Sequence, residues 1–210
     1  MTTFGIHDFG FFLVAGILLN LTPGPDTAYI LGRSIAQGRE AGVASAFGIC
    51  VGSIFHTCAA ALGLSAILAT SALAFGAIKL LGGAYLIFLG IKMILDRRKH
   101  LNLPSNFRRR TTTAAFRQGV FTNVLNPKVA LFFLAFLPQF IDSASNIKVL
   151  AFLMLGFTFV TTGTIWCLIL AWFASALSNR LRTNETVAQW LNRTAGALFV
   201  FLGLRLATAK

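Results

Sequence analysis

The chain has 210 residues, of which 56% are hydrophobic and only 11% are charged. Soluble globular domains carry about a quarter charged residues, so this composition argues against that class, and it excludes intrinsic disorder and coiled coil. The formal net charge of +12 would suggest a nucleic-acid partner in a soluble protein, whereas in so apolar a chain it indicates basic loops that orient a membrane protein. We therefore predict a small all-α polytopic membrane protein whose partner is the lipid bilayer.

Six apolar segments follow one another along the chain, and each can cross a bilayer at about 20 residues per span. The predicted spans are Phe9–Leu31, Ala41–Ala69, Phe75–Leu95, Ala114–Phe140, Val149–Phe173 and Val187–Ala207. We expect a single translocator-sized domain over residues 1–210, divided by a basic loop at 96–113 into a first half, 1–95, and a second half, 114–210. Most of the 21 phenylalanines are expected to face lipid.

Basic residues gather in the first, third and fifth loops, which alternating spans place on one side of the membrane. Ten lie there, against Lys148 and Lys210 on the other side: Arg33, Arg39, Arg97, Arg98, Lys99, Arg108, Arg109, Arg110, Arg180 and Arg182. Because positively charged loops stay in the cytoplasm, both termini are predicted to be periplasmic. A cytoplasmic loop accounts for the basic segment better than a nucleic-acid site does, so no nucleic-acid partner is expected.

The third and sixth spans share a pattern. Residues 83–92 read GAYLIFLGIK and residues 196–205 read GALFVFLGLR, so five positions are identical and both segments end in a basic residue. Aligning Pro25 with Pro127 also places Asp26 opposite Lys128. Each half holds three spans, an odd number, so the halves must have opposite orientations. The sequence thus predicts six transmembrane helices as two inverted three-helix repeats, an arrangement typical of secondary transporters.

Proline clusters interrupt the first and fourth spans. Proline lacks an N–H group and clashes with the preceding helical turn, so we expect a helix break in each of these spans. A broken helix presents N–H groups that attract anions and carbonyl groups that attract cations. The candidate substrate-binding residues are those at the two breaks: Pro23, Gly24, Pro25, Asp26, Asn123, Asn126, Pro127 and Lys128.

Asp26 and Lys128 are the ionisable residues at these breaks. A charge inside a membrane costs about 3 kcal/mol or more, so such residues usually face the interior and find a partner. Two interpretations remain open. The pair is a structural ion pair that locks two helices, or it binds a zwitterion, with Asp26 on the ammonium group and Lys128 with helix N–H groups on the carboxylate.

His56 lies on a stripe of small residues spaced four apart, with Gly48, Gly52 and Ala60. Such spacing marks a helix face that packs closely on another helix, so His56 is predicted to point into the bundle. Histidine titrates near neutral pH, which makes proton coupling a hypothesis beside a plain packing role. The spans hold no clustered Cys, His or carboxylate ligands, so neither a metal nor another cofactor is expected.

These motifs resemble a known family. Pro23-Gly24-Pro25-Asp26, with the later Gly48, Gly52 and His56, is similar to the first half of LysE/RhtB-family translocators. Asn126-Pro127-Lys128 and the segment 136–140, FLPQF, resemble the second signature of that family. The resemblance implies an exporter of amino acids or their derivatives in the inner membrane of a bacterium, driven by the proton gradient.

The sequence therefore favours a proton-coupled secondary transporter rather than an enzyme. Its expected substrates are small neutral amino acids similar to homoserine, threonine or leucine, because Asp26 is the only obvious deep anion. The alternatives are a membrane-embedded enzyme, a non-transporting accessory subunit and, within transport, a metal-ion exporter. The particular amino acid, the coupling ion and a homo-oligomeric state are left open by the sequence.

Overall fold

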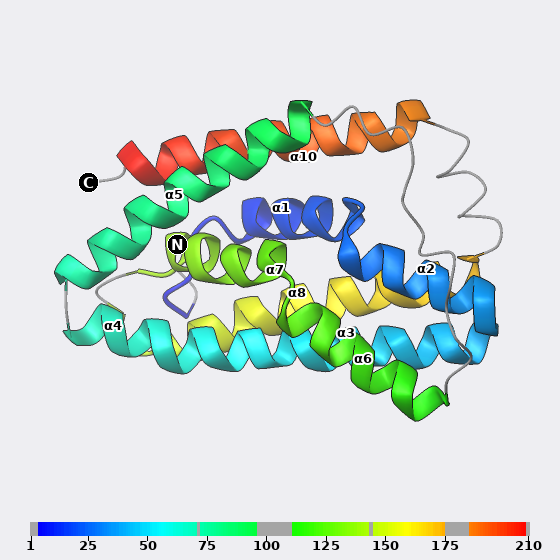
Figure 1. Cartoon of the computed structure of the whole chain (residues 1–210). Coiled ribbons are helices and arrows are strands. Elements are labelled where there is room, and N and C mark those ends of the chain that lie inside the picture. Colours follow the sequence, from blue (N-terminus) through cyan, green and yellow to red (C-terminus); the bar gives the residue numbers. More distant parts are fainter. Residues whose placement is uncertain (1–3, 71, 96–110, 143–144, 175–184, 209–210) are drawn as a thin grey trace.

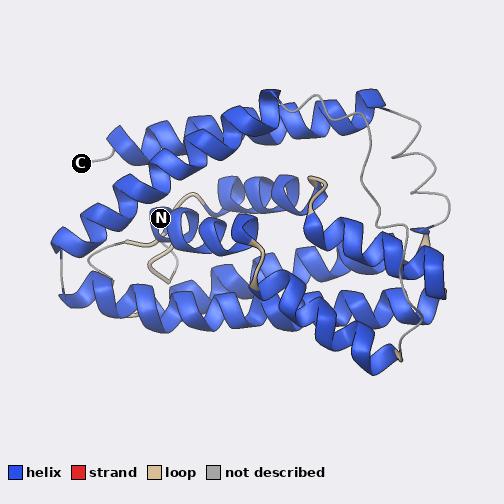
Figure 2. Cartoon of the chain, viewed as in Figure 1, coloured by secondary structure: helices blue, strands red, loops and turns tan. Residues whose placement is uncertain are grey.

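A computed structural model describes residues 4–70, 72–95, 111–142, 145–174 and 185–208. Within these residues every regular element is a helix, and an isolated antiparallel bridge joins Ile6 to Ile141 (Figure 2). Residues 96–110, which make up most of the predicted basic loop, lie outside the described residues, as do Arg180, Arg182 and Lys210.

The helices begin and end within a few residues of the predicted spans (Figure 1). In chain order they are α1 (Phe9–Leu21), α2 (Pro25–Gln37), α3 (Arg39–Ala59), the π-helical η1 (Ala60–Leu64), α4 (Ser65–Thr70), α5 (Ala72–Leu95), α6 (Thr112–Val124), α7 (Pro127–Leu131), the π-helical η2 (Phe132–Phe136), the 3₁₀ helix η3 (Leu137–Phe140), α8 (Lys148–Trp172) and α10 (Glu185–Thr208).

Two helices of the described chain are long and apolar enough to cross a membrane, namely Arg39–Ile67 with 29 residues and Lys148–Trp172 with 25 residues. Two bent pairs raise this number to four if each pair is one span: α1 with α2, bent by 47°, and α6 with the segment Pro127–Phe140, bent by 46°. Helices α5 and α10 contain shorter apolar stretches in their described parts.

Both predicted breaks are confirmed. The α1 helix ends where the Thr22 hydroxyl donates to the carbonyl oxygen of Leu18 over 2.6 Å, and α2 restarts at Pro25 after the extended residue Gly24. The second break leaves α7 starting at Pro127, with the Asn126 side chain accepting a hydrogen bond from the Lys128 main-chain N–H. Proline suits the first position of a helix because its missing N–H is not needed there.

Small residues bring α3 and α6 into backbone contact. A Cβ atom at Gly48 would collide with the carbonyl oxygen of Phe116, and one at Gly119 would lie 2.7 Å from that of Ser45. Gly52 faces Asn123 in the same way, since a Cβ atom there would lie 2.7 Å from the Asn123 Cβ. The predicted packing of this stripe on another helix is confirmed.

The repeated glycines explain how α5 and α10 lie side by side (Figure 1). A Cβ atom at Gly90 would lie 2.5 Å from the carbonyl oxygen of Gly196, and one at Gly203 would lie 2.6 Å from that of Gly83. Because the earlier glycine of each helix meets the later glycine of the other, the two helices run antiparallel. Any larger residue at these positions would push the helices apart.

The prediction that most phenylalanines face lipid is wrong for a large group of them. Phe12 of α1 packs on Phe132 and Phe136 of η2, and Phe132 lies 4.8 Å from Phe159 of α8, measured between ring centroids. These rings are buried because α1 and the second half of the fourth span lie inside the bundle rather than on its surface. Other buried phenylalanines are Phe133, Phe140, Phe152 and Phe199.

The placement of Arg33 in the first loop is also wrong. Helix α2 continues to Gln37, and Arg33 is only 2% exposed. Its guanidinium donates to the side chains of Gln37 and of Gln118 on α6, the latter over 2.6 Å, and it lies beside the Tyr29 ring. A buried charge needs such partners, and Arg33 therefore joins α2 to α6 instead of contributing to the charge of a loop.

Candidate functional site

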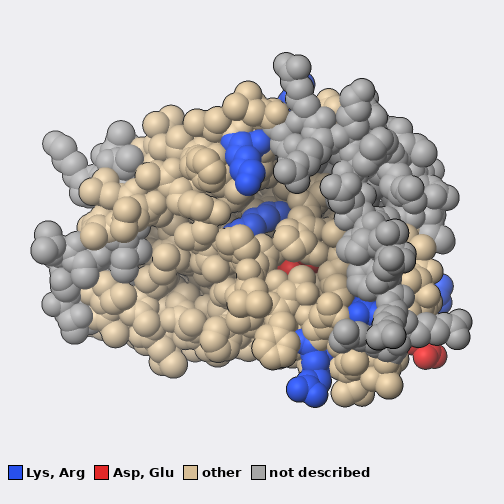
Figure 3. Space-filling view, viewed as in Figure 1, with Lys and Arg blue, Asp and Glu red and all other residues tan. Residues whose placement is uncertain are grey.

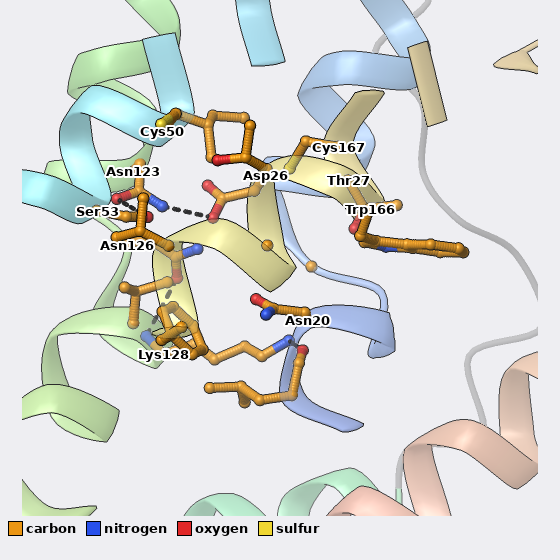
Figure 4. Close-up of a pocket in the computed structure, with 18 of the residues that line it drawn as sticks. Asn20, Asp26, Thr27, Cys50, Ser53, Asn123, Asn126, Lys128, Trp166 and Cys167 are labelled. Atoms are coloured by element: carbon orange, nitrogen blue, oxygen red, sulfur yellow. Dashed lines mark hydrogen bonds between the residues drawn. The ribbon is translucent and has the colours of Figure 1, made fainter. Parts of the chain in front are cut away.

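The two helix breaks meet at a polar cavity in the middle of the molecule (Figure 4). Figure 3 shows a basic and an acidic surface close together in a hollow of one face. Five of the predicted site residues line the cavity: Gly24, Asp26, Asn123, Asn126 and Lys128. Helices α1, α3 and α8 supply most of the rest of the wall, together with Thr22, Thr27 and Val129. The structure thus gathers residues that lie about a hundred positions apart in the sequence.

Asp26 stands in the first turn of α2 and is held by the other half of the chain. Its Oδ2 atom accepts a hydrogen bond of 2.8 Å from the Asn123 side-chain amide. Asn123 is in turn fixed by the Ser53 hydroxyl, which donates to Asn123 Oδ1 over 3.2 Å. The second carboxylate oxygen, Oδ1, is buried and receives no hydrogen bond from the described residues.

Lys128 stands in the first turn of α7 and reaches back to the end of α1. Its Nζ atom donates to the carbonyl oxygens of Leu19 and Thr22, each over 2.9 Å. The Leu19 carbonyl also accepts the Thr22 main-chain N–H over 3.2 Å, whereas the break in the first span leaves the Thr22 carbonyl beyond the helix end, where carbonyls lose their helical N–H partners. The side chain passes Gly24, where a Cβ atom would be in ordinary contact with Nζ at 3.7 Å. The expected cation at the freed carbonyls is therefore the ammonium group of Lys128.

Asp26 and Lys128 share one cavity, but the described structure forms no direct ion pair between them. Each charge has its own hydrogen-bond partner in the opposite half of the chain. Among the predicted site residues, Pro23, Pro25 and Pro127 do not line the cavity. They shape the breaks that bring the polar side chains there.

His56 points into the bundle, as predicted, and is 8% exposed. Its Nε2 atom lies 3.1 Å from the main-chain oxygen of Asn123, and its ring stacks on Phe133. His56 does not line the central cavity. It borders a separate apolar groove of about 300 Å³ between η1 and the segment Ala130–Leu134.

The comparisons with known proteins agree with the motifs around this cavity. The profile of the LysE type translocator family matches residues 17–210. The chain belongs to the LysE type translocator family. This family consists of transporters, and its efflux members support the assignment of the chain as an amino-acid exporter at the family level.

Three relatives show how far the similarity of this translocator extends. An uncharacterized membrane protein of Vibrio cholerae is 32% identical, with 98% of each chain covered. Another from Pseudomonas aeruginosa is 30% identical over 100% of this chain and 99% of the relative. The leucine efflux protein of Klebsiella pneumoniae is 28% identical over 99% of this chain and 98% of its own length. No solved structure matches the translocator.

Sequence reasoning missed several polar residues of the cavity wall, including Asn20, Ser53, Thr164 and Trp166. Asn20 donates to the Thr162 hydroxyl of α8 over 3.2 Å. These residue types are common in membrane helices, where Ser and Thr often bond to their own helix. The spacing of these residues in the sequence does not indicate a binding site. The packing of the helices decides which of their faces border the cavity.

The cavity of the translocator has a volume of about 40 Å³. A water molecule needs about 10–15 Å³ of such space, so a few waters can enter. Pockets for small organic ligands usually measure about 300–1,000 Å³. The cavity, as it stands, is smaller than pockets that hold small organic ligands.

Proposed function

We propose that this translocator exports neutral amino acids with aliphatic side chains across the bacterial inner membrane, driven by protons. The central cavity is the substrate site, and it opens alternately to the two sides of the membrane. Six spans arranged as two inverted halves form the transporter, with the basic loops in the cytoplasm. The name of the leucine efflux relative and the polar cavity between the two breaks support the proposal.

The crossed contacts of Asp26 and Lys128 carry the argument for inverted halves. Asp26 follows the first break and contacts Asn123, at the helix end just before the second break. Lys128 follows the second break and contacts Leu19 and Thr22, at the helix end just before the first break. A pseudo-two-fold axis between the halves produces such an exchange of contacts, and transporters bind substrate at this kind of interface.

The lining of the cavity favours a neutral side chain. Asp26 is the only acidic residue among the described lining residues, and Lys128 is the only basic one. If Asp26 binds the α-ammonium group, a lysine-like side chain has no carboxylate to pair with, and burying an unpaired charge is costly. Apolar residues make up much of the remaining wall: Leu19, Ile49, Val129, Phe159 and Val160.

We propose that Asp26 is the residue that couples transport to protons. The ionised carboxylate holds the substrate ammonium group, and a proton that neutralises the carboxylate releases it. His56 contacts the main chain of Asn123, whose side chain holds Asp26. A change in the charge of His56 therefore reaches Asp26 through the position of Asn123.

Efflux from preloaded cells tests this function. Overexpression is expected to speed the loss of labelled leucine, whereas Asp26→Asn, expressed at the same level, is expected to abolish the gain. A protonophore is expected to stop efflux while ATP is held constant. If efflux survives collapse of the proton gradient, proton coupling is wrong. If a panel of amino acids shows no efflux, the substrate class is wrong, and an enzyme or accessory subunit becomes the better explanation.

A further inference from the structure

Three polar side-chain atoms in the wall of the central cavity are buried and lack a hydrogen-bond partner among the described residues. They are Oδ1 of Asp26, the hydroxyl of Thr164 and Nε1 of the Trp166 indole. Buried polar groups in native proteins almost always have partners, so unpartnered ones call for an explanation such as an ion, a water or a ligand. Here all three belong to the same cavity.

The Thr164 hydroxyl differs from those of its neighbours on α8. Thr158, Thr161 and Thr162 donate to the main-chain carbonyl four residues earlier, over 2.8–3.0 Å. This local bond is the usual way in which a threonine hydroxyl is satisfied in an apolar helix. Thr164 makes no such bond, so its hydroxyl is available to the cavity.

The Trp166 indole adds a group that can only donate. The N–H of a buried tryptophan normally finds an acceptor, and Thr164 and Trp166 lie on the α8 helix that also supplies Gly163 and Cys167 to the cavity wall. Figure 4 shows Cys167 next to Asp26, whereas Trp166 lies beside Thr27. The α8 helix therefore lines the cavity from the carboxylate of Asp26 to the indole of Trp166.

The Lys128 ammonium group uses two of its three N–H donors on the carbonyl oxygens of Leu19 and Thr22, so it has one donor left for a substrate carboxylate. Within the proposed function, on which this step rests, we propose that Thr164 and Trp166 donate hydrogen bonds to the carboxylate of the transported amino acid, while Asp26 Oδ1 accepts from its ammonium group. One unpartnered acceptor and two unpartnered donors match the two ends of a zwitterion.

This assignment makes the free carboxylate a condition for transport. Leucinamide replaces the charged carboxylate with a neutral amide, and isopentylamine lacks the group altogether, but both keep the ammonium group and the aliphatic chain. Hydrogen bonds to a charged group are stronger than those to a neutral one. The translocator therefore selects leucine over both analogues through α8, and not through Asp26.

Competition against labelled leucine in proteoliposomes of the full-length protein tests the assignment. We expect leucine to compete at least about tenfold better than leucinamide or isopentylamine, because each charged hydrogen bond to the carboxylate corresponds to about tenfold in affinity. Thr164→Val and Trp166→Phe keep the size of each side chain and remove the donor. Each is expected to weaken competition by leucine about tenfold and to leave that of isopentylamine within about twofold.

Matched substitutions separate recognition from folding. Thr161→Val and Trp190→Phe remove the same groups from exposed positions, and we expect them to leave the affinities for leucine and for isopentylamine unchanged. Thr164→Ser keeps the hydroxyl that Thr164→Val removes, so we expect it to keep the selectivity of the wild type for leucine. Variants that weaken leucine and isopentylamine equally, or that leave leucine binding unchanged, overturn the assignment while the proposed function stands. A wild-type protein that transports no amino acid overturns the proposed function and the assignment together.

Discussion

Asn123 donates its side-chain amide to Asp26 over 2.8 Å and so joins the last turn of α6 to the first turn of α2. The same residue accepts from the Ser53 hydroxyl of α3 and, through its main-chain oxygen, contacts His56. One side chain thus fixes the position of the carboxylate in the central cavity and connects three helices. Its loss has consequences for both stability and transport.

Replacing Asn123 with leucine, which has a similar branched shape but no amide, should remove the hydrogen bond that Asp26 Oδ2 accepts from Asn123. Hydrogen bonds to charged groups contribute about 1.5–3 kcal/mol to stability, so we expect Asn123→Leu to lower the unfolding temperature and to abolish efflux. Thermal unfolding of the purified protein and efflux at matched expression measure this. Thr161→Val, on the exposed face of α8, is the control, and an Asn123→Leu variant with normal stability and efflux would contradict the role given to Asn123.

Neutralising Asp26 in addition to Lys128 should not recover the stability that is lost when Lys128 alone is neutralised. Lys128→Met removes the donor of Leu19 and Thr22, and we expect a loss of about 3 kcal/mol for two charge-assisted bonds. Adding Asp26→Asn supplies no new donor to these carbonyls and relieves no broken ion pair, because Lys128 is not directly paired with Asp26. We therefore expect the double variant to be no more abundant in membranes than Lys128→Met alone, measured by quantitative immunoblotting.

A double variant that returns to the wild-type level would give the opposite result. It would show that the two charges are paired in the cell and that the pair costs more than it contributes. Lys128→Arg is a useful control, since it keeps a donor within reach of the carbonyls but replaces the compact ammonium group with a planar guanidinium. It is expected to fall between the wild type and Lys128→Met.

A methyl group on α3 should separate α3 from α6. Gly48→Ala places a Cβ atom against the carbonyl oxygen of Phe116, and overpacking of this kind typically costs about 1–3 kcal/mol. We expect a lower unfolding temperature and a smaller folded fraction in size-exclusion chromatography. Gly10→Ala is the matched control, because nothing lies within 4 Å of a Cβ atom there. Equal effects of the two substitutions would rule out close packing as the reason for Gly48.

The basic residues of the loops predict that both termini are periplasmic and that the loop at 96–113 is cytoplasmic. Single cysteines at Ser105 and Thr208, in a chain without Cys50, Cys58 and Cys167, can be labelled with a membrane-impermeant thiol reagent. In intact spheroplasts we expect labelling at Thr208 and not at Ser105, and in permeabilised cells we expect labelling at both. Labelling of Ser105 alone in intact spheroplasts would reverse the orientation.

The sequence alone determined the helices and where they break. Apolar length predicted the segments, and Pro25 and Pro127 predicted the restarts of α2 and α7, because a missing N–H acts on the local backbone whatever surrounds it. The matched glycines of α5 and α10 were also visible, since close backbone contact tolerates no side chain at these positions. The family motifs consist of the same residues, so membership of the family is also visible in the sequence.

Only the tertiary structure decided what each side chain meets. The sequence predicts Arg33 in a loop, but the structure buries it against Gln118. Lys128 binds the carbonyls of Leu19 and Thr22 rather than Asp26. Thr164 and Trp166 gave no sign in the sequence, because a hydroxyl or an indole becomes significant only when packing buries it beside a cavity and leaves it without a partner. Helix formation depends on neighbours along the chain, whereas burial and pairing depend on which faces of distant helices come together, and that is a property of the whole fold.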